Sequence, residues 1–318
     1  MSISDKLKKI LHDNFIVRLV KSIQLPGLSG TTLYDLIVIL LKGVSNQIFG
    51  LRVSAVAWAF FFSVFPFLLF LFSVLPYAPL YHEIKTLLFS EFIPRILPER
   101  ITNEVVDYVS NTATGAGKKN LGYLFILLSI FLSSNGITVL IKGFNTSEYG
   151  YAKRRKGINT RLVSIGLTLL FVVLIIAQLI FTYYTQFIWL YIEESNNFLK
   201  VPMMVQFLNF LSASLFYFTS LILLYVYGTN IKQRIRNVVP GALMATVLFF
   251  ITLLGFQFYI KKFNHYDLLY GSVGLVMILM LFIYINVLLI MVGFELNASI
   301  YQAKLHKKNQ PEQINSMN

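Results

Sequence analysis

Residues 272–300 read SVGLVMILMLFIYINVLLIMVGFELNASI and contain a single charged side chain, that of Glu295. About 20 apolar residues are enough for a helix to cross about 30 Å of hydrocarbon. Five more runs of this kind lie earlier in the chain, at 53–77, 121–141, 162–191, 205–227 and 238–260. The sequence therefore predicts an all-α, polytopic membrane protein with six transmembrane helices.

The composition of the 318-residue chain agrees with this fold class. With 56% hydrophobic and only 13% charged residues, the chain is too apolar for a soluble protein of this length. The net charge of +13 predicts contact with anionic lipid head groups, and no nucleic-acid partner is expected. There is no Cys, and the four His have no metal-binding spacing, so the sequence predicts neither a metal site nor a cofactor. The N-terminal residues do not resemble a cleaved signal peptide.

All 27 Lys and Arg residues fall outside the six runs and are shared unevenly between the connecting segments. The two terminal segments and the loops 142–161 and 228–237 hold nineteen of them, and the other three loops hold eight. Short loops rich in Lys and Arg stay in the cytoplasm. The pattern predicts a multi-pass protein of the cell membrane with both termini cytoplasmic.

The densest basic run is expected to contact anionic lipids at the cytoplasmic face, although nucleic-acid binding is an alternative. It consists of Lys153, Arg154, Arg155 and Lys156.

Three parts are expected along the chain. Residues 1–50 form cytoplasmic or interfacial amphipathic helices, because apolar residues after Leu33 recur at helical spacing; a helix packed in the bundle is the alternative. Residues 51–303 form the six-helix transmembrane domain, with two short amphipathic helices in the outside loop 78–120. Residues 304–318 form a cytoplasmic polar tail.

Polar residues inside the runs are candidates for a polar pathway, because ionisable and amide groups in hydrocarbon face protein or a water-filled cavity. Glu295 is either part of such a pathway or an interfacial carboxylate paired with a cytoplasmic Arg or Lys. Asn286 and Asn297 lie on the same run. Ser134 and Asn135 belong to a patch of small and polar residues that is expected to face other helices or a cavity. No catalytic residue is predicted.

Other residues within the runs have structural interpretations. Pro66 interrupts the first run and is a candidate hinge, although most such kinks are static. Gln178, Gln206, Asn209 and Gln257 are expected either to join helices or to line a cavity.

Several motifs resemble the YihY/BrkB family of bacterial inner-membrane proteins, once described as ribonuclease BN. They are AWAFFFSVFPF at 57–67, PGA at 240–242, YGSVG at 270–274 and GFELNA at 293–298. The resemblance covers roughly residues 33–303. It implies a six-helix protein of the bacterial cytoplasmic membrane, and an envelope function or lipid movement has been suggested for members.

The leading interpretation is a non-enzymatic protein that moves or accommodates an amphipathic envelope substrate such as a phospholipid. The chain has no ATP-binding motif, so transport would not be driven by ATP. An envelope scaffold that transports nothing is the alternative. A membrane-tethered ribonuclease is the least favoured reading, because its cytoplasmic carboxylates are scattered and metal-dependent cleavage needs them clustered. The sequence sets no oligomeric state.

Overall fold

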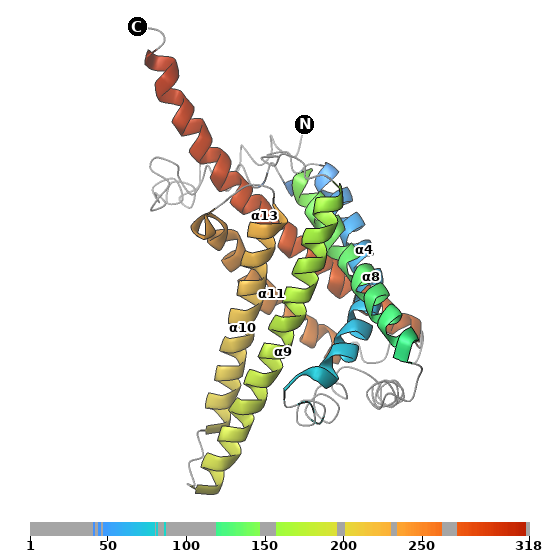
Figure 1. Ribbon diagram of the computed structural model, residues 1–318. Coiled ribbons are helices and arrows are strands. Elements are labelled where there is room, and N and C mark those ends of the chain that lie inside the picture. The colour runs from blue at the N-terminus through green and yellow to red at the C-terminus, as the bar shows by residue number, and fades with distance from the viewer. Residues whose placement is uncertain are drawn as a thin grey trace.

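The computed structural model of the protein is shown in Figure 1. The residues that it describes are 47–79, 119–146, 157–195, 201–229, 234–262 and 272–315, with the single positions 41, 44, 45, 81 and 86. The basic run 153–156, the outside loop between 87 and 118, and nearly all of residues 1–46 lie outside the described residues.

The described chain is helical and contains no strand. Its elements are α4 (Gln47–Val74), η1 (Leu75–Tyr77), α8 (Lys119–Asn145), α9 (Gly157–Ser195), α10 (Val201–Gly228), α11 (Ile235–Lys262) and α13 (Ser272–Asn315). Each of the six α-helices contains a stretch long and apolar enough to cross a membrane. The predicted all-α class with six transmembrane helices is confirmed.

The helices extend beyond the apolar runs, which corrects one expectation. The candidate spans now take in four basic residues, namely Arg52, Lys142, Arg161 and Arg236. Apolar runs end where charge begins, whereas a helix continues as long as its backbone is hydrogen-bonded. Long basic side chains also reach polar partners from positions inside a span. Basic residues are therefore part of the spans as well as of the loops.

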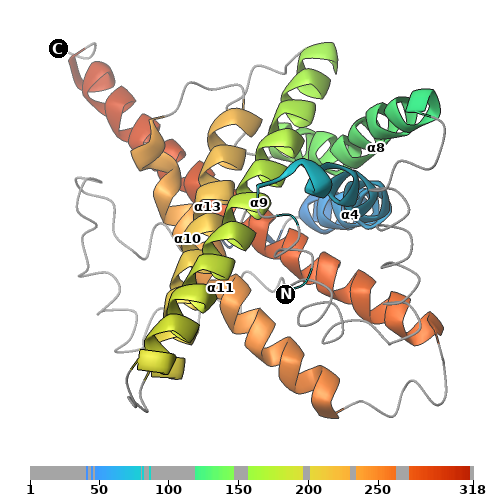
Figure 2. The same cartoon turned by 60° about the horizontal axis from the view of Figure 1, so that its bottom comes forward.

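The six helices form a closed circuit of neighbours. Each packs against the helix that follows it, and α13 also packs against α4, so that the last span contacts the first. The views in Figures 1 and 2 show the long α9–α10 pair and the adjacent α4 and α8. We call the end of the bundle at which α4, α9 and α11 begin the Arg52 end.

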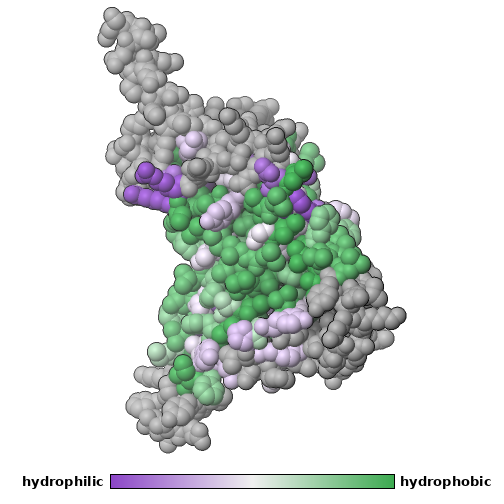
Figure 3. Space-filling model, in the orientation of Figure 1, coloured by the Kyte–Doolittle hydropathy of each residue, from purple (hydrophilic) through white to green (hydrophobic). Residues whose placement is uncertain are grey.

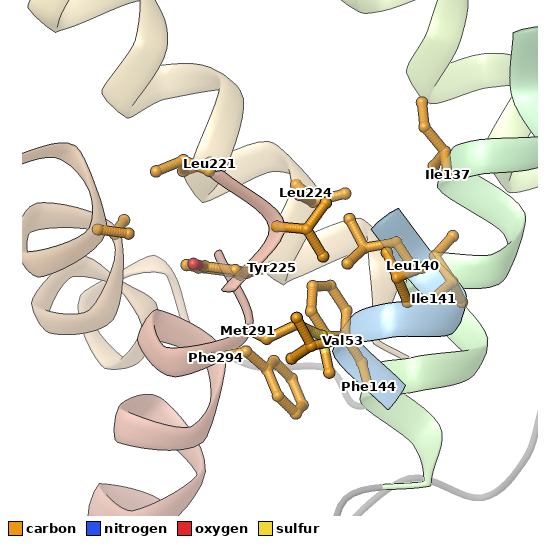
Figure 4. Packing of buried hydrophobic residues seen from close by; sticks show 14 of the residues in the cluster. Val53, Ile137, Leu140, Ile141, Phe144, Leu221, Leu224, Tyr225, Met291 and Phe294 are labelled. Carbon is orange, nitrogen blue, oxygen red and sulfur yellow. The ribbon is translucent and has the colours of Figure 1, made fainter. Parts of the chain in front are cut away.

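The apolar core lies at the Arg52 end. Figure 4 shows Val53, Phe144, Tyr225 and Phe294 converging from α4, α8, α10 and α13. These four side chains are at most 3% exposed. All six long helices are thus joined here, since Leu167 of α9 and Val238 of α11 belong to the same cluster.

A hydrophobic belt surrounds the middle of the molecule. Figure 3 shows apolar side chains across this zone, with hydrophilic side chains along its upper edge. Large apolar side chains such as Phe207, Leu254 and Met277 are more than half exposed. Such a surface is expected where lipid replaces water as the solvent.

α4 and α8 approach each other closely at Ser63 and Gly136. The Ser63 hydroxyl accepts a hydrogen bond from the Gly136 N–H at 2.8 Å and donates to the Ala59 carbonyl at 2.8 Å. A Cβ atom at position 136 would lie 3.2 Å from the Cα of Phe60. A small residue at 136 and a hydroxyl at 63 thus let the two backbones meet.

We expect Ser63→Ala to lower the free energy of unfolding by about 1 kcal/mol, because the Gly136 N–H loses its inter-helix acceptor. Chemical unfolding of the purified protein in detergent, followed by circular dichroism, measures this. Ser73→Ala is the matched control, since the Ser73 hydroxyl bonds the Leu69 carbonyl of its own helix at 2.7 Å. Equal effects of the two variants would contradict the role assigned to Ser63.

Candidate functional site

The last turns of the α13 span join it to several other helices. Phe294 stacks on Phe144 of α8 with ring centroids 4.2 Å apart. The hydroxyl of Tyr225 in α10 donates to the Ile290 carbonyl at 2.8 Å. We call the segment Gly293–Asn297 the α13 hub, because its residues also contact α4 and α11, as the following paragraphs describe.

An ion pair between α13 and α4 lies in the hub. The Arg52 Nη2 is 3.0 Å from the Glu295 Oε1, and the two side chains are 8% and 0% exposed. Glu295 is the only acid in the six candidate spans. The carboxylate therefore pairs with an arginine, and it does so inside the bundle rather than at an exposed membrane interface.

Arg52 links a third helix to this pair. Its Nη1 donates to the Gly143 carbonyl at 3.3 Å, and its guanidinium lies 5.5 Å from the centroid of the Phe49 ring. Gly143 is in the last turn of α8, where carbonyl groups have no donor within the helix and a nearby cation is favourable. The Arg52 Nε is buried without a hydrogen-bond partner. One side chain of α4 thus holds both α8 and α13.

The α11–α13 contact is a crossing of two glycines. A Cβ on Gly241 would lie 2.0 Å from the Gly293 carbonyl oxygen, and a Cβ on Gly293 would lie 2.6 Å from the Tyr225 hydroxyl. No real Cβ contact is that short, so both positions require the absence of a side chain. The PGA and GFELNA motifs contact each other at this crossing.

Asn297 bonds the backbone of α11 on both sides of Pro240. Its Oδ1 accepts from the Gly241 N–H at 2.7 Å, and its Nδ2 donates to the Val238 carbonyl at 3.0 Å. A proline has no N–H and interrupts the helix ladder. The Asn297 amide therefore adds two inter-helix hydrogen bonds beside the residue at which α11 lacks an N–H, and it faces α11 while Glu295 faces α4.

Asn286 has a different environment from the hub. Its Nδ2 donates to the Phe282 carbonyl of its own helix at 2.7 Å, and its Oδ1 is buried without a partner. A buried acceptor without a donor is costly. Asn286 is the one predicted pathway residue with an unused buried polar atom.

Ser134 and Asn135 lie on α8 and point to different surroundings. Ser134 is fully buried, and its hydroxyl donates to the Phe131 carbonyl at 2.9 Å. Asn135 is exposed, and its Oδ1 accepts from the Arg161 Nη1 at 3.4 Å. Three of the five predicted pathway residues thus lie in separate contacts: Glu295 between α13 and α4, Asn297 between α13 and α11, and Asn135 between α8 and α9. The other two bond within their own helices.

Both arginines were missed in the sequence because each lies one residue before an apolar run. Helical spacing gives the signal that reveals Arg52, since Phe49, Val53 and Val56 lie on the same buried side of α4. Arg161 gives a weaker signal, because its neighbour Leu162 is exposed.

A polar stripe along α9 also went unnoticed. Its members are buried or half-buried and form two groups with spacings of three or four residues, separated by ten residues: Thr160, Ser164 and Thr168, then Gln178, Thr182 and Thr185. Gln178 donates to the Ser212 hydroxyl at 3.0 Å, and Thr185 donates to the Asn209 Oδ1 at 2.8 Å. Gln178 and Asn209 therefore join α9 to α10, whereas Gln206 and Gln257 are exposed.

Two further predictions concern metal binding and a hinge. Within the described ranges no three His, Asp or Glu side chains lie together. α4 is one continuous helix through Pro66, which leaves the Phe62 carbonyl without its usual donor. The hinge role of Pro66 and the lack of enzymatic activity stay predictions.

Comparison with known proteins identifies the family. Residues 40–315, which include all six long helices, match the family described as Virulence factor BrkB. The ribonuclease-like protein YfkH of Bacillus subtilis (strain 168) is 30% identical over 79% of this chain and 90% of its own length. The UPF0761 membrane protein of Vibrio campbellii is 26% identical over 96% and 92%. That of Alteromonas mediterranea is 25% identical over 87% and 91%.

No solved structure matches the chain. The matched length, the relatives named as membrane proteins and the contact between the PGA and GFELNA motifs agree with one another. The chain is an integral membrane protein of the BrkB family.

Proposed function

We propose that the protein moves or accommodates an amphipathic envelope substrate in the bacterial cytoplasmic membrane without using ATP, and that the seam between α4 and α13 opens during this movement. The observation that carries the proposal is the buried Arg52–Glu295 pair, with its 3.0 Å contact at the point where the helix circuit closes.

Energetics favour a functional role for this pair. Replacing a buried ion pair with well-packed apolar residues is often neutral or stabilises a protein by about 1–4 kcal/mol. The seam could therefore be closed as firmly by apolar side chains alone. Charged residues inside membrane spans commonly mark pathways and moving parts. A pair that loses little when water or substrate solvates it suits a seam that opens.

The connectivity of the circuit also favours this seam. α4 and α13 are the first and last of the six long helices, so no short loop ties them together. Every other neighbouring pair in the circuit is consecutive among these helices. Of the six contacts, the α4–α13 contact is the one that separates without straining a direct connection.

The polar stripe on α9 supports movement of a substrate with a polar head. Six polar side chains lie on one side of a 39-residue helix, in two groups of three near its two ends, and the helix measures about 58 Å at a rise of 1.5 Å per residue. Such a helix is long enough to carry polar groups across the whole hydrocarbon layer.

We infer the direction of the protein in the membrane from the basic segments, which favour cytoplasmic termini.

The proposal is tested with the double variant Arg52→Met/Glu295→Leu in liposomes that contain fluorescent phospholipid. Dithionite, which bleaches only the outer leaflet, reports movement between leaflets. We expect wild-type protein to move labelled lipid, and the folded double variant to move it at least tenfold more slowly, because the seam is then closed by apolar contacts. Gly255→Ala is the control, since nothing lies within 4 Å of its added Cβ.

Two results would count against the proposal. Double-variant protein that moves lipid at the wild-type rate would remove the seam from the mechanism. Wild-type protein that moves neither lipid nor any tested solute would remove transport altogether.

An envelope scaffold is the second candidate, and one observation favours it. Polar side chains of the hub are paired with protein groups: Glu295 with Arg52, and Asn297 with the backbone of α11. A scaffold needs only such rigid pairing. It predicts that the double variant retains every function in cells and that wild-type liposomes show no movement.

A further inference from the structure

The side chain of Arg161 is half-buried at the α8–α9 contact, and its guanidinium is held there by neutral groups. Its Nη1 donates to the Thr138 hydroxyl at 3.2 Å and to the Asn135 Oδ1 at 3.4 Å, and its Nη2 donates to the Phe131 carbonyl. The guanidinium carbon lies 3.9 Å from the centroid of the Phe131 ring. A positive charge is thus fixed in position without a negative partner among the described residues.

The charge contrasts with that of Arg52. In the described part of the chain, the Arg52–Glu295 contact is the one ion pair within 4.0 Å. An uncompensated charge in a candidate span is expensive. Arg161 therefore differs from Arg52 in that the charge to neutralise it must come from outside these residues.

Not every N–H group of the Arg161 guanidinium has an acceptor. A guanidinium has five N–H groups, and the structure supplies three acceptors. The Nε is buried without a partner. The second N–H of Nη2 has no acceptor among the described residues, and a guanidinium N–H forms strong, charge-assisted hydrogen bonds with phosphate or carboxylate oxygens. The missing partner is therefore an anion whose oxygen atom accepts from Nη2.

An exposed apolar stripe leads along α8 to this charge. Leu124, Leu128 and Phe131 are 62%, 48% and 51% exposed and lie three or four residues apart, followed by Asn135. From Leu124 to Asn135 the helix rises about 16 Å. One leaflet of hydrocarbon is about 15 Å thick. The surface thus offers a cation at one end and a leaflet's length of apolar contact beside it.

We propose that Arg161 binds the phosphate of a bilayer phospholipid whose acyl chains lie along Leu124, Leu128 and Phe131. The inference rests on the proposed function and deepens it, because it names a phosphate-bearing lipid as the substrate class and α8–α9 as its docking surface. A phosphate supplies the missing charge and an acceptor oxygen for the remaining Nη2 N–H. The acyl chains cover the apolar stripe.

The test measures lipid binding by the purified protein in detergent with native mass spectrometry. Phosphatidylglycerol is the probe, diacylglycerol with the same chains lacks the phosphate, and inorganic phosphate lacks the chains. We expect the wild type to retain phosphatidylglycerol and neither of the other two. Arg161→Gln should weaken retention about tenfold or more, the loss expected for a charge-assisted hydrogen-bonded pair.

A second variant keeps the test valid if Arg161→Gln fails to fold. Asn135→Asp preserves the shape of the side chain and places a carboxylate next to the Arg161 Nη1, 3.4 Å away in the wild type. This internal anion should compete with the phosphate and lower retention about tenfold while raising the melting temperature. Lys142→Gln, an exposed cation near the end of the same helix, is the control and should retain the lipid.

Several outcomes would overturn the inference. They are equal retention of diacylglycerol, undiminished retention by Asn135→Asp, or an equal loss in Lys142→Gln. The assay is independent of transport, since the Arg52→Met/Glu295→Leu variant should still bind phosphatidylglycerol. Lipid binding without movement between leaflets would refute the proposed function and leave the Arg161 site standing.

Discussion

Glu295→Leu is expected to lower the free energy of unfolding by about 3–5 kcal/mol, because Arg52 then remains buried in an apolar seam without its counter-charge. The effect is large since the Arg52 side chain is only 8% exposed. Chemical unfolding in detergent, followed by circular dichroism, gives the value.

Arg52→Met/Glu295→Leu is the control for this prediction. With both charges removed, most of the lost stability should return, because no isolated charge is left in the seam. The two measurements together separate the cost of an unpaired arginine from the cost of altered packing. If the double variant is as unstable as Glu295→Leu, the pair itself is what stabilises the seam, and the argument for an opening seam loses its energetic basis.

Gly241→Ala is expected to destabilise the protein by about 3 kcal/mol or more. The new Cβ would lie 2.0 Å from the Gly293 carbonyl oxygen and 2.5 Å from the Asn297 Nδ2. Forced overpacking costs about 1–3 kcal/mol, and separation of the helices also breaks the Asn297 hydrogen bonds at about 1 kcal/mol each. A Cβ has no alternative rotamer, so the backbones themselves must move.

Gly255→Ala on the same helix is the matched control. Nothing lies within 4 Å of a Cβ at this position, so alanine should stabilise α11 by about 0.5–1 kcal/mol through its helix propensity. Melting temperatures of the two variants in the same detergent should therefore move in opposite directions. A fall of similar size in both would show that the glycine crossing is not the sensitive contact.

The sequence was sufficient for the number and approximate position of the helices, because the signal for each span accumulates over about 20 residues. It was less accurate at the ends, where charge stops an apolar run before the helix stops. The third run was placed at 162–191, whereas α9 extends from Gly157 to Ser195. For this reason the sequence assigns Arg161 to a loop, although it lies in α9.

The partners of the polar residues were harder to foresee. A lone acid in an apolar run identified Glu295 as unusual, and an Arg or Lys partner was one of two interpretations. The partner is Arg52, which lies in the first span, and this pairing depends on the contact between the first and last helices of the circuit. Apolar helix faces fit many neighbours, so a single sequence does not indicate which faces meet. The two hydrogen bonds of Asn297 likewise could not be predicted, because they depend on α13 lying beside the part of α11 that contains Pro240.

Contact between the first and last spans also has a consequence for biogenesis. A ribosome synthesises Arg52 long before Glu295, and domains assemble as the chain emerges. During that interval the arginine enters the membrane region while the carboxylate that neutralises it has not yet been made. Until α13 has been inserted, Arg52 of α4 must then stay near the lipid–water boundary or pair with another anion. Completion of the bundle is thus coupled to the synthesis of its final helix.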